Sequence, residues 1–218
     1  MIENVTERAK EILKRLKKLY PEPIVELDFT TPFELMIAAI LAAQNRDTNI
    51  NKITPALFRK YKGPADYVAV DSAELEQDII KSGFFRQKTK ALKAVSQKLL
   101  DEFGGKVPET MDELLSLPGV GRKTANAVLS FAMGKAEGIV VDVHHLRVEP
   151  RLGMSMQKTA DKMEQELLTT VPKKDWIMWS SSITLHGRRV CTARKPKCSN
   201  CVLGPDVCPS YMKIDDAV

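Results

Sequence analysis

The sequence predicts an all-α protein, and three observations carry that prediction. Apolar residues recur at intervals of three and four along most of the 218 residues, the spacing that places them on one face of a helix. Sequences typical of helix N-termini recur between these stretches. Only one short run, Gly138–Val141, resembles a strand.

The first part of the chain shows clear helix boundaries. An apolar stripe over Ile12–Tyr20 predicts a helix that Pro21 ends, because proline cannot continue it. Thr31–Glu34 forms a capping box with proline at the first helical position. The run Leu35–Ala43 is apolar on every side, so the helix that follows the box should be central and buried.

Helical patterns continue to the cysteine-rich end. A stripe over Leu92–Phe103 predicts a long helix that ends at two glycines, and Thr110–Glu113 is a second capping box. Further helices are expected from about Arg122 to before Gly134 and over 143–152, 159–169 and 174–185. Pro150 should bend or shorten the one over 143–152.

Composition constrains function only weakly. The net charge of +5 is compatible with a polyanionic partner but does not require one. No run of 18 or more apolar residues is present, and the N-terminus lacks the basic and apolar regions of a signal peptide. We therefore expect a cytoplasmic protein without a membrane span.

The four cysteines are more informative, because all of them lie near the C-terminal end. Their spacing is Cys191-x6-Cys198-x2-Cys201-x6-Cys208. A tight cluster in a cytoplasmic chain favours a metal or cluster site over a disulfide framework. Four thiolates suit zinc or a [4Fe–4S] cluster, and ligand chemistry leaves both open.

The segment Leu117–Gly121 separates two helical patterns. Pro118 ends the first helix, while Gly119 and Gly121 permit positive φ and leave backbone amides uncovered. The next helix begins at once, so its N-terminal amides and dipole suit a phosphate oxygen. A plain turn between two helices would use the same residues.

Three ordered segments resemble the endonuclease III family of helix-hairpin-helix DNA glycosylases. Leu117–Ala125 is similar to its hairpin signature, Val141–Val148 to the region of its essential aspartate, and Cys191–Cys208 to its four-cysteine loop. The resemblance implies a bifunctional DNA glycosylase/AP lyase of base excision repair. Such an enzyme removes oxidised pyrimidines from duplex DNA and cleaves the strand by β-elimination. The resemblance favours [4Fe–4S] over zinc, although the last cysteine interval has six residues where the family typically has five.

The resemblance also implies two domains with the DNA cleft between them. A six-helix barrel is expected over 22–135 and contains the hairpin. A discontinuous iron–sulfur domain is expected over 1–21 and 136–211, followed by a tail over 212–218. The implied partner is double-stranded DNA with damaged bases or abasic sites, bound by a monomer in the nucleoid.

Lys123 and Asp142 match the catalytic pair of that family. The lysine amine attacks C1′ of the damaged nucleotide and forms a Schiff base, and the carboxylate supports positive charge on the sugar and assists proton transfers. Lys123 falls in the first turn of a helix, where the dipole disfavours a cation. Alternatively, Lys123 is a solvated surface residue and Asp142 only caps the helix that begins at Val143.

Base excision from duplex DNA requires the base to be flipped out of the stack. By resemblance, Gln44 and Phe84 fill the vacated space; their alternatives are a helix-terminal amide and a core aromatic. His144 is expected to contact the DNA backbone or to order Asp142, and a histidine satisfied by local contacts alone is the alternative. The other predicted DNA contacts lie in the hairpin and near the cysteines: Gly119, Val120, Gly121, Arg122, Arg147, Arg188, Arg194 and Lys195.

Two other functions remain open from the sequence. A monofunctional mismatch or uracil glycosylase on the same scaffold needs Asp142 but not Lys123. A non-catalytic DNA-binding module needs neither. The presence of both residues favours the bifunctional enzyme.

Overall fold

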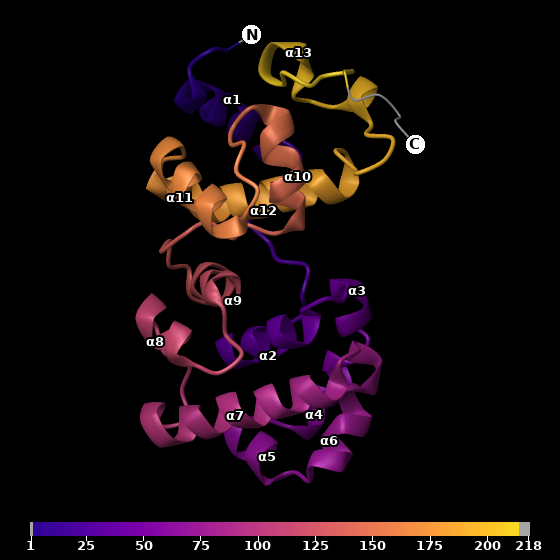
Figure 1. Cartoon of the computed structure of the whole chain (residues 1–218), viewed down its shortest axis with the longest axis vertical. Coiled ribbons are helices and arrows are strands. Elements are labelled where there is room, and N and C mark those ends of the chain that lie inside the picture. Colours follow the sequence, from indigo (N-terminus) through magenta and orange to yellow (C-terminus); the bar gives the residue numbers. More distant parts are fainter. Residues whose placement is uncertain (1, 214–218) are drawn as a thin grey trace. The chain divides into compact units, whose positions relative to one another are not determined.

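The computed structural model describes residues 2–213, and its regular structure over these residues is entirely helical (Figure 1), which confirms the all-α prediction. The chain divides into two compact units. One is Val25–Lys135, and the other consists of the chain up to Ile24 and from Ala136 onwards. None of the described helices is long and apolar enough to cross a membrane. Residues 214–218 of the predicted tail lie outside the described residues.

The strand-like run Gly138–Val141 forms no strand, in keeping with the all-α prediction. The segment is irregular, with the side chains of Ile139 and Val141 buried. The amide of Val140 donates to the hydroxyl of Ser180 at 2.9 Å, so a side chain takes the place of a neighbouring strand. Burial alone therefore accounts for this apolar run.

The Val25–Lys135 unit forms around α2 (Pro32–Ala42), whose side chains are buried on nearly every side, as the sequence predicts. Thr31 caps this helix by accepting from the amide of Glu34 at 3.1 Å. The carboxylate of Glu34 accepts from both the amide and the hydroxyl of Thr30 at 2.6 Å. The return bond of the capping box thus goes one residue further back than predicted.

The longest helix of this unit, α7 (Phe85–Phe103), packs against α2 and against two short helices, α5 (Pro64–Ala69) and α6 (Ser72–Ile79). The amine of Lys93 on α7 donates to the carbonyl of Val68 near the C-terminus of α5 at 2.9 Å. The remaining elements are α3 (Asp47–Ile50), α4 (Thr54–Lys60), η1 (Ile80–Ser82), α8 (Met111–Ser116), α9 (Arg122–Ala127) and the π-helical segment η2 (Val128–Ala132).

The second unit has α12 (Trp176–Arg189) at its centre, in contact with α1 (Val5–Lys17) and α10 (Val143–Leu152). Helix α10 continues through Pro150 and ends two residues later. The guanidinium of Arg8 on α1 donates to the carbonyl of Gly153 at 2.9 Å. The other elements are α11 (Ala160–Thr170), η3 (Lys173–Asp175), η4 (Cys198–Asn200) and α13 (Gly204–Val207).

Close packing of α12 on α10 depends on Gly187. A Cβ atom at this position would lie 2.8 Å from Cβ of His144 and 3.1 Å from Cγ2 of Val148. Both distances are below ordinary van der Waals contact, so only glycine allows this approach. Gly187 thereby fixes the start of α10, where Asp142 and two histidines lie.

Candidate active site and nucleic-acid interface

In the Val25–Lys135 unit, Lys123 lies in the first turn of α9 with its side chain exposed to solvent. Gly121 is the N-cap residue, so no side chain caps the amides of this turn. These are the groups through which a helix N-terminus binds phosphate.

The hairpin before α9 is shaped by one glycine rather than two. Gly119 has φ of 79°, and a Cβ there would lie 3.1 Å from Cβ of Ala91, so conformation and space both require glycine. Gly121 has φ of −93°, which other residues adopt easily. The side chain of Val120 is buried in the core, which leaves its backbone as the part that can reach DNA.

In the other unit, Asp142 is the N-cap residue of α10, with its side chain 9% exposed. Its Oδ1 accepts from the amides of His144 at 2.8 Å and His145 at 3.1 Å. The same atom contacts Nδ1 of His145 at 3.2 Å. Oδ2 takes part in none of these bonds. Asp142 therefore caps the helix with one oxygen and retains the other for a second partner.

The environment keeps Asp142 ionised. Burial acts to raise its pKa, but the hydrogen bond and the charge of His145, together with His144 and the backbone, outweigh burial and hold the pKa well below its usual value. An anionic carboxylate is what a developing positive charge on the sugar requires.

The expectation that His144 orders Asp142 is only partly right. His144 contributes its backbone amide, but its ring contacts two arginines: Nη2 of Arg147 at 3.0 Å and Nε of Arg188 at 3.3 Å. The imidazole on Asp142 belongs to His145, which is fully buried. The sequence held a signal for this, because the third helical residue is the one whose side chain reaches back to the N-cap residue.

Arg147 has a structural role that sequence reasoning missed. Its Nε donates to the carbonyl of Cys191 at 3.1 Å and its Nη2 to that of Gly187 at 2.7 Å. It therefore holds the end of α12 and the first cysteine against α10. These bonds use its Nε and Nη2, and the DNA contact of Arg147 stays a prediction.

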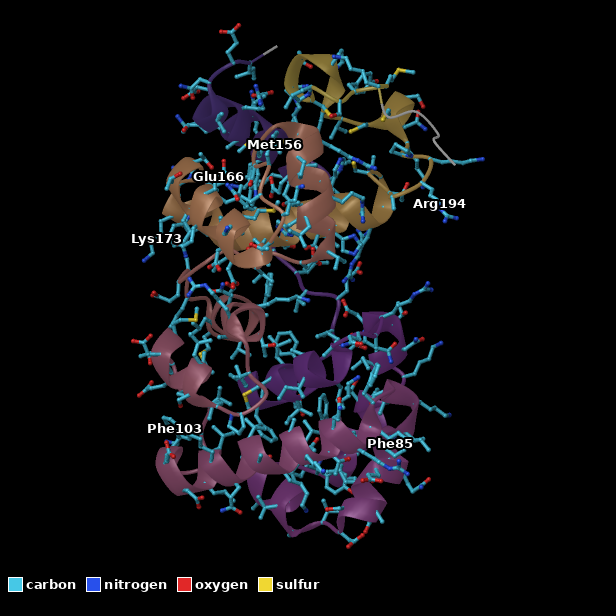
Figure 2. All side chains as sticks on the ribbon, viewed as in Figure 1. Phe85, Phe103, Met156, Glu166, Lys173 and Arg194 are labelled. Carbon is cyan, nitrogen blue, oxygen red and sulfur yellow. The ribbon has the colours of Figure 1, made fainter. Side chains whose placement is uncertain are left out.

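The cysteine loop presents exposed cations on an ordered backbone. The hydroxyl of Thr192 donates to the carbonyls of Arg194 at 2.8 Å and Lys195 at 3.2 Å, and Arg151 donates to the carbonyl of Thr192 at 2.8 Å. Arg194 and Lys195 are exposed, and Figure 2 shows Arg194 projecting away from the ribbon. Such a surface suits phosphate contacts that do not read sequence.

Gln44 and Phe84, the two residues predicted to fill the space vacated by the flipped base, share an unusual backbone conformation. Gln44 has φ of 57° and Phe84 has φ of 49°, a left-handed region that costs energy for residues other than glycine. Both side chains are exposed, and Phe84 is 58% accessible although aromatic. Phe84 is therefore not a core aromatic; its neighbour Phe85 packs against the core instead.

A buried lysine joins the Gln44 and Phe84 loops. The amine of Lys88, which is 6% exposed, donates to the carbonyls of Leu41 at 2.8 Å and Ser82 at 2.7 Å. The side-chain amide of Asn45 also donates to Ser82 at 2.8 Å. Burial lowers the pKa of Lys88. Sequence reasoning missed this residue, although it occupies an apolar-stripe position one turn before Leu92.

Substituting Lys88 with methionine should loosen both loops while filling a similar volume. The carbonyl of Leu41 loses the Lys88 donor and that of Ser82 keeps only Asn45, and an unpaired buried polar group costs about 1–3 kcal/mol. We expect a lower midpoint in urea and weaker binding to duplex DNA carrying an abasic analogue. Lys88→Arg, which retains donors, should lose less binding; equal binding by Lys88→Met and the unaltered protein would contradict a positioning role.

The four cysteines are free of disulfide bonds. The thiols act electrostatically on one another, and Arg151 donates to Sγ of Cys191 at 3.3 Å. Burial raises the pKa of Cys208 to about 11, so bound cations are needed to hold it as a thiolate. Within residues 2–213, no three His, Cys, Asp or Glu side chains form a ready-made site for one metal ion. Four soft thiol ligands fit an iron–sulfur cluster.

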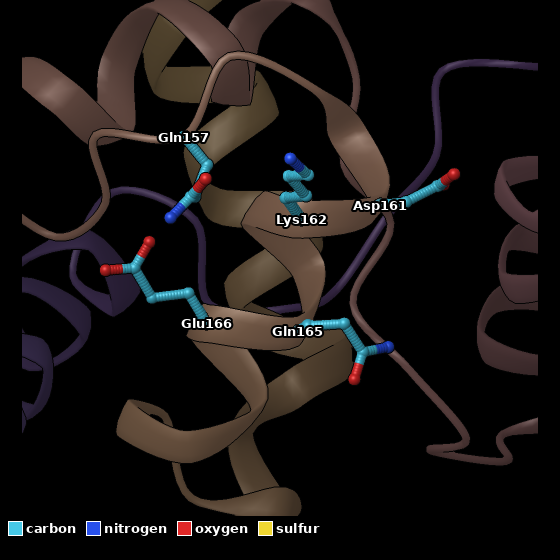
Figure 3. Close-up of a pocket in the computed structure, with 5 residues that line it drawn as sticks. All are labelled: Gln157, Asp161, Lys162, Gln165 and Glu166. Carbon is cyan, nitrogen blue, oxygen red and sulfur yellow. The ribbon is translucent and has the colours of Figure 1, made fainter.

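A separate depression near α11 carries no catalytic arrangement. Its lining residues are all of polar or charged types, and Figure 3 shows Asp161 and Gln165 pointing away from Gln157 and Glu166. None of the predicted site residues lines it.

Comparison with known protein families identifies the class. Residues 37–173 match the HhH-GPD superfamily of base excision DNA repair proteins, and residues 191–205 match the iron–sulfur binding domain of endonuclease III. The first match includes Lys123 and Asp142. The second includes three of the cysteines and ends before Cys208.

Comparison with individual proteins identifies the family. The chain is 46% identical to endonuclease III of Synechocystis sp., over 94% of this chain and 93% of the relative. It is 38% identical to that of Escherichia coli, over 94% and 96%. A solved structure of a trapped endonuclease III–DNA covalent intermediate superposes with a TM-score of 0.89 at 39% identity, covering 98% of this chain and 99% of that one. A thermostable thymine-DNA glycosylase gives 0.85 at 25% identity, covering 95% and 98%.

The chain belongs to the endonuclease III family. It is accordingly a base-excision-repair enzyme, a DNA glycosylase with AP lyase activity. The cysteine loop is the iron–sulfur binding region of that family, and its cofactor is a [4Fe–4S] cluster rather than zinc.

Proposed function

We propose that this enzyme excises oxidised pyrimidines, with Lys123 as the nucleophile and Asp142 as the supporting carboxylate. The proposal rests on the accessibility of the Lys123 amine and on the ionisation of the Asp142 carboxylate. Lys123 presents an accessible amine on the first turn of α9. Asp142 is a buried, ionised carboxylate with Oδ2 outside its capping bonds.

The reaction follows from these groups. The Lys123 amine forms a bond to C1′ as the bond to the base breaks, and the base leaves with the electron pair. Loss of a proton from the attacking nitrogen and opening of the sugar give a Schiff base. This imine acidifies C2′, and removal of a proton there expels the 3′ phosphate by β-elimination. Asp142 lowers the energy of the cationic sugar through its fixed negative charge. The published covalent intermediate of a similar endonuclease III with DNA supports this assignment.

The other site residues are proposed to contact DNA, either at phosphates or within the base stack. The Gly119–Gly121 turn and Arg122 hold a phosphate at α9, and Arg188, Arg194 and Lys195 add contacts from the second unit. His144 supports them through Arg188. Gln44 and Phe84 enter the stack as the base leaves it. A monomer acting on chromosomal DNA in the cytoplasm, at the nucleoid, is the setting that this substrate implies.

A lesion panel tests the proposed substrate. Duplexes carrying thymine glycol, uracil, a thymine mismatch or an abasic site are incubated with enzyme, with and without borohydride. We expect cleavage and covalent trapping with thymine glycol and the abasic site, and little with uracil or the mismatch. Excision of uracil or mismatched thymine without strand cleavage would instead establish the monofunctional enzyme.

The cluster is proposed to be structural, held by Cys191, Cys198, Cys201 and Cys208. When bound, it supplies cross-links that fix the basic loop. Cys208→Ser should therefore reduce iron content and visible absorbance. Losing roughly 3 kcal/mol of binding energy would lower the melting temperature by about 10 °C in a chain of this size. A variant that keeps its absorbance and melting temperature would exclude Cys208 as a ligand.

A further inference from the structure

Beneath Asp142, two fully buried ionisable side chains have no part in the reaction described above. His145 and Glu149 are both 0% exposed and lie one helical turn apart on α10, so they occupy the same face. Nδ1 of His145 contacts Asp142 at 3.2 Å. Oε1 of Glu149 accepts from Nε1 of Trp179 on α12 at 2.8 Å.

Each of these side chains has one buried polar atom left without a partner. They are Nε2 of His145 and Oε2 of Glu149. Buried polar atoms are normally hydrogen-bonded, and leaving two unpaired on one helix face is costly. No direct hydrogen bond joins the two atoms, but both are satisfied at once if one buried water and a proton from Glu149 bridge them.

We propose that His145 and Glu149 form a proton-holding pair that keeps an imidazole N–H directed at Asp142, and that this pair sets the alkaline limit of the reaction. His145 and Glu149 are positioning residues here. The inference rests on the proposed role of Asp142.

The reason lies in the tautomers of imidazole. A neutral imidazole carries one proton, and only the Nδ1–H form can donate to Asp142. If Glu149 is protonated, its hydroxyl donates through the bridging water to Nε2, and the proton of the ring must be on Nδ1. If the proton moves from Glu149 to Nε2, the ring is a cation and still donates from Nδ1. In both forms the pair holds two protons, and Asp142 keeps its donor.

Loss of one proton from the pair removes that donor. The ring then carries a single proton between two anions, Asp142 and Glu149. Asp142 already accepts two backbone amides, whereas buried Glu149 accepts only from Trp179 among the bonds seen here. The proton therefore goes to Nε2, and the Nδ1 lone pair faces the Asp142 carboxylate.

The charge environment supports titration in the working range. Burial raises the pKa of Glu149 to about 7, opposed by the charge of His145 and the bond from Trp179. A raised pKa means that the proton is held at low pH and lost as pH rises. The other charged or polar groups facing this end of α10 come from α10 and α12: His144, Arg147, Thr184 and Arg188.

Glu149→Gln tests the pair without removing its hydrogen bonds. The glutamine oxygen can accept from Trp179 and its N–H can donate to Nε2 through the same bridging water, but the side chain does not titrate. Single-turnover trapping on abasic DNA is measured for both proteins from about pH 6 to about pH 9. Because Lys123 and Asp142 are common to both, taking the ratio of the two rates removes their contribution.

We divide the rate of the unaltered enzyme by that of Glu149→Gln at each pH. This ratio should fall by about tenfold to a hundredfold as pH rises across the range, because one hydrogen bond to a charged group contributes that much. Glu166→Gln, a carboxylate change on α11 in the same unit, should give a ratio that does not vary with pH. A ratio for Glu149→Gln that is equally flat would overturn the proposal.

A spectroscopic measurement separates the pair from the chemistry. In protein with ¹⁵N-labelled histidine, the His145 signals should change from Nδ1–H to Nε2–H as pH rises, and should not change in Glu149→Gln. A His145 tautomer independent of pH in the unaltered protein would also overturn the proposal. If the unaltered enzyme fails to trap DNA while the tautomer changes, the catalytic assignment fails and the pair stands.

Discussion

Lys123→Gln is expected to abolish covalent trapping of abasic DNA by borohydride. Glutamine has no nucleophilic amine and cannot form an imine, so the covalent route is closed. Strand cleavage should fall by about 10³-fold or more, to the level of unassisted elimination. The side chain is exposed on the first turn of α9, so the fold should not depend on it and the melting temperature should be unchanged.

The measurement is a denaturing gel of enzyme–DNA adducts, with binding to an uncleavable abasic analogue measured in parallel. Lys90→Gln provides a matched control, because Lys90 is an exposed lysine on a helix of the same unit and should trap normally. Persistent trapping by Lys123→Gln would assign the nucleophile elsewhere. Loss of binding to the analogue would instead indicate a docking role for Lys123.

Asp142→Asn is expected to produce the second large effect. Asparagine is a good N-cap residue, so the bonds to the amides of His144 and His145 can be kept and the helix should remain intact. The negative charge is lost, and with it the stabilisation of a cationic sugar. We expect the single-turnover rate to fall by about 10²–10⁴-fold while the melting temperature changes little.

Comparison with Asp142→Ala separates capping from catalysis. Alanine removes the cap as well as the charge, and the missing cap should cost about 1 kcal/mol of stability. Both variants should be similarly slow, but only the alanine variant should melt earlier. Near-normal rates for Asp142→Asn would mean that the carboxylate serves only as a cap.

Several features of the fold could be predicted because they depend on residues close together in the chain. The capping residues Thr31 and Thr110 accept from the amides three residues on, as the spacing indicates. Local pattern alone could not explain the strand-like run Gly138–Val141, whose apolar side chains are buried against other segments without strand pairing.

In the candidate site too, some features follow from local sequence patterns and others from contacts between distant segments. Lys123, Asp142 and the cysteines could be selected because their neighbours in sequence form recognisable patterns. The placement of Arg147 could not, because it binds backbone carbonyls of Gly187 and Cys191, at least 40 residues away in the chain. The left-handed backbone of Gln44 and Phe84 was equally hidden, since neither residue favours that conformation.

By itself, the sequence determined the all-α class and the order of the helices, and its resemblance to a known family selected the four cysteines proposed as cluster ligands and the two residues proposed for catalysis. Periodicity, capping and spacing are local properties, and each can be evaluated within a few residues. Only the tertiary structure decided that the ring of His144 contacts two arginines, that Lys88 joins the Gln44 and Phe84 loops, and that Glu149 is fully buried. Those outcomes depend on burial and on contacts between distant segments, which arise only when the helices pack.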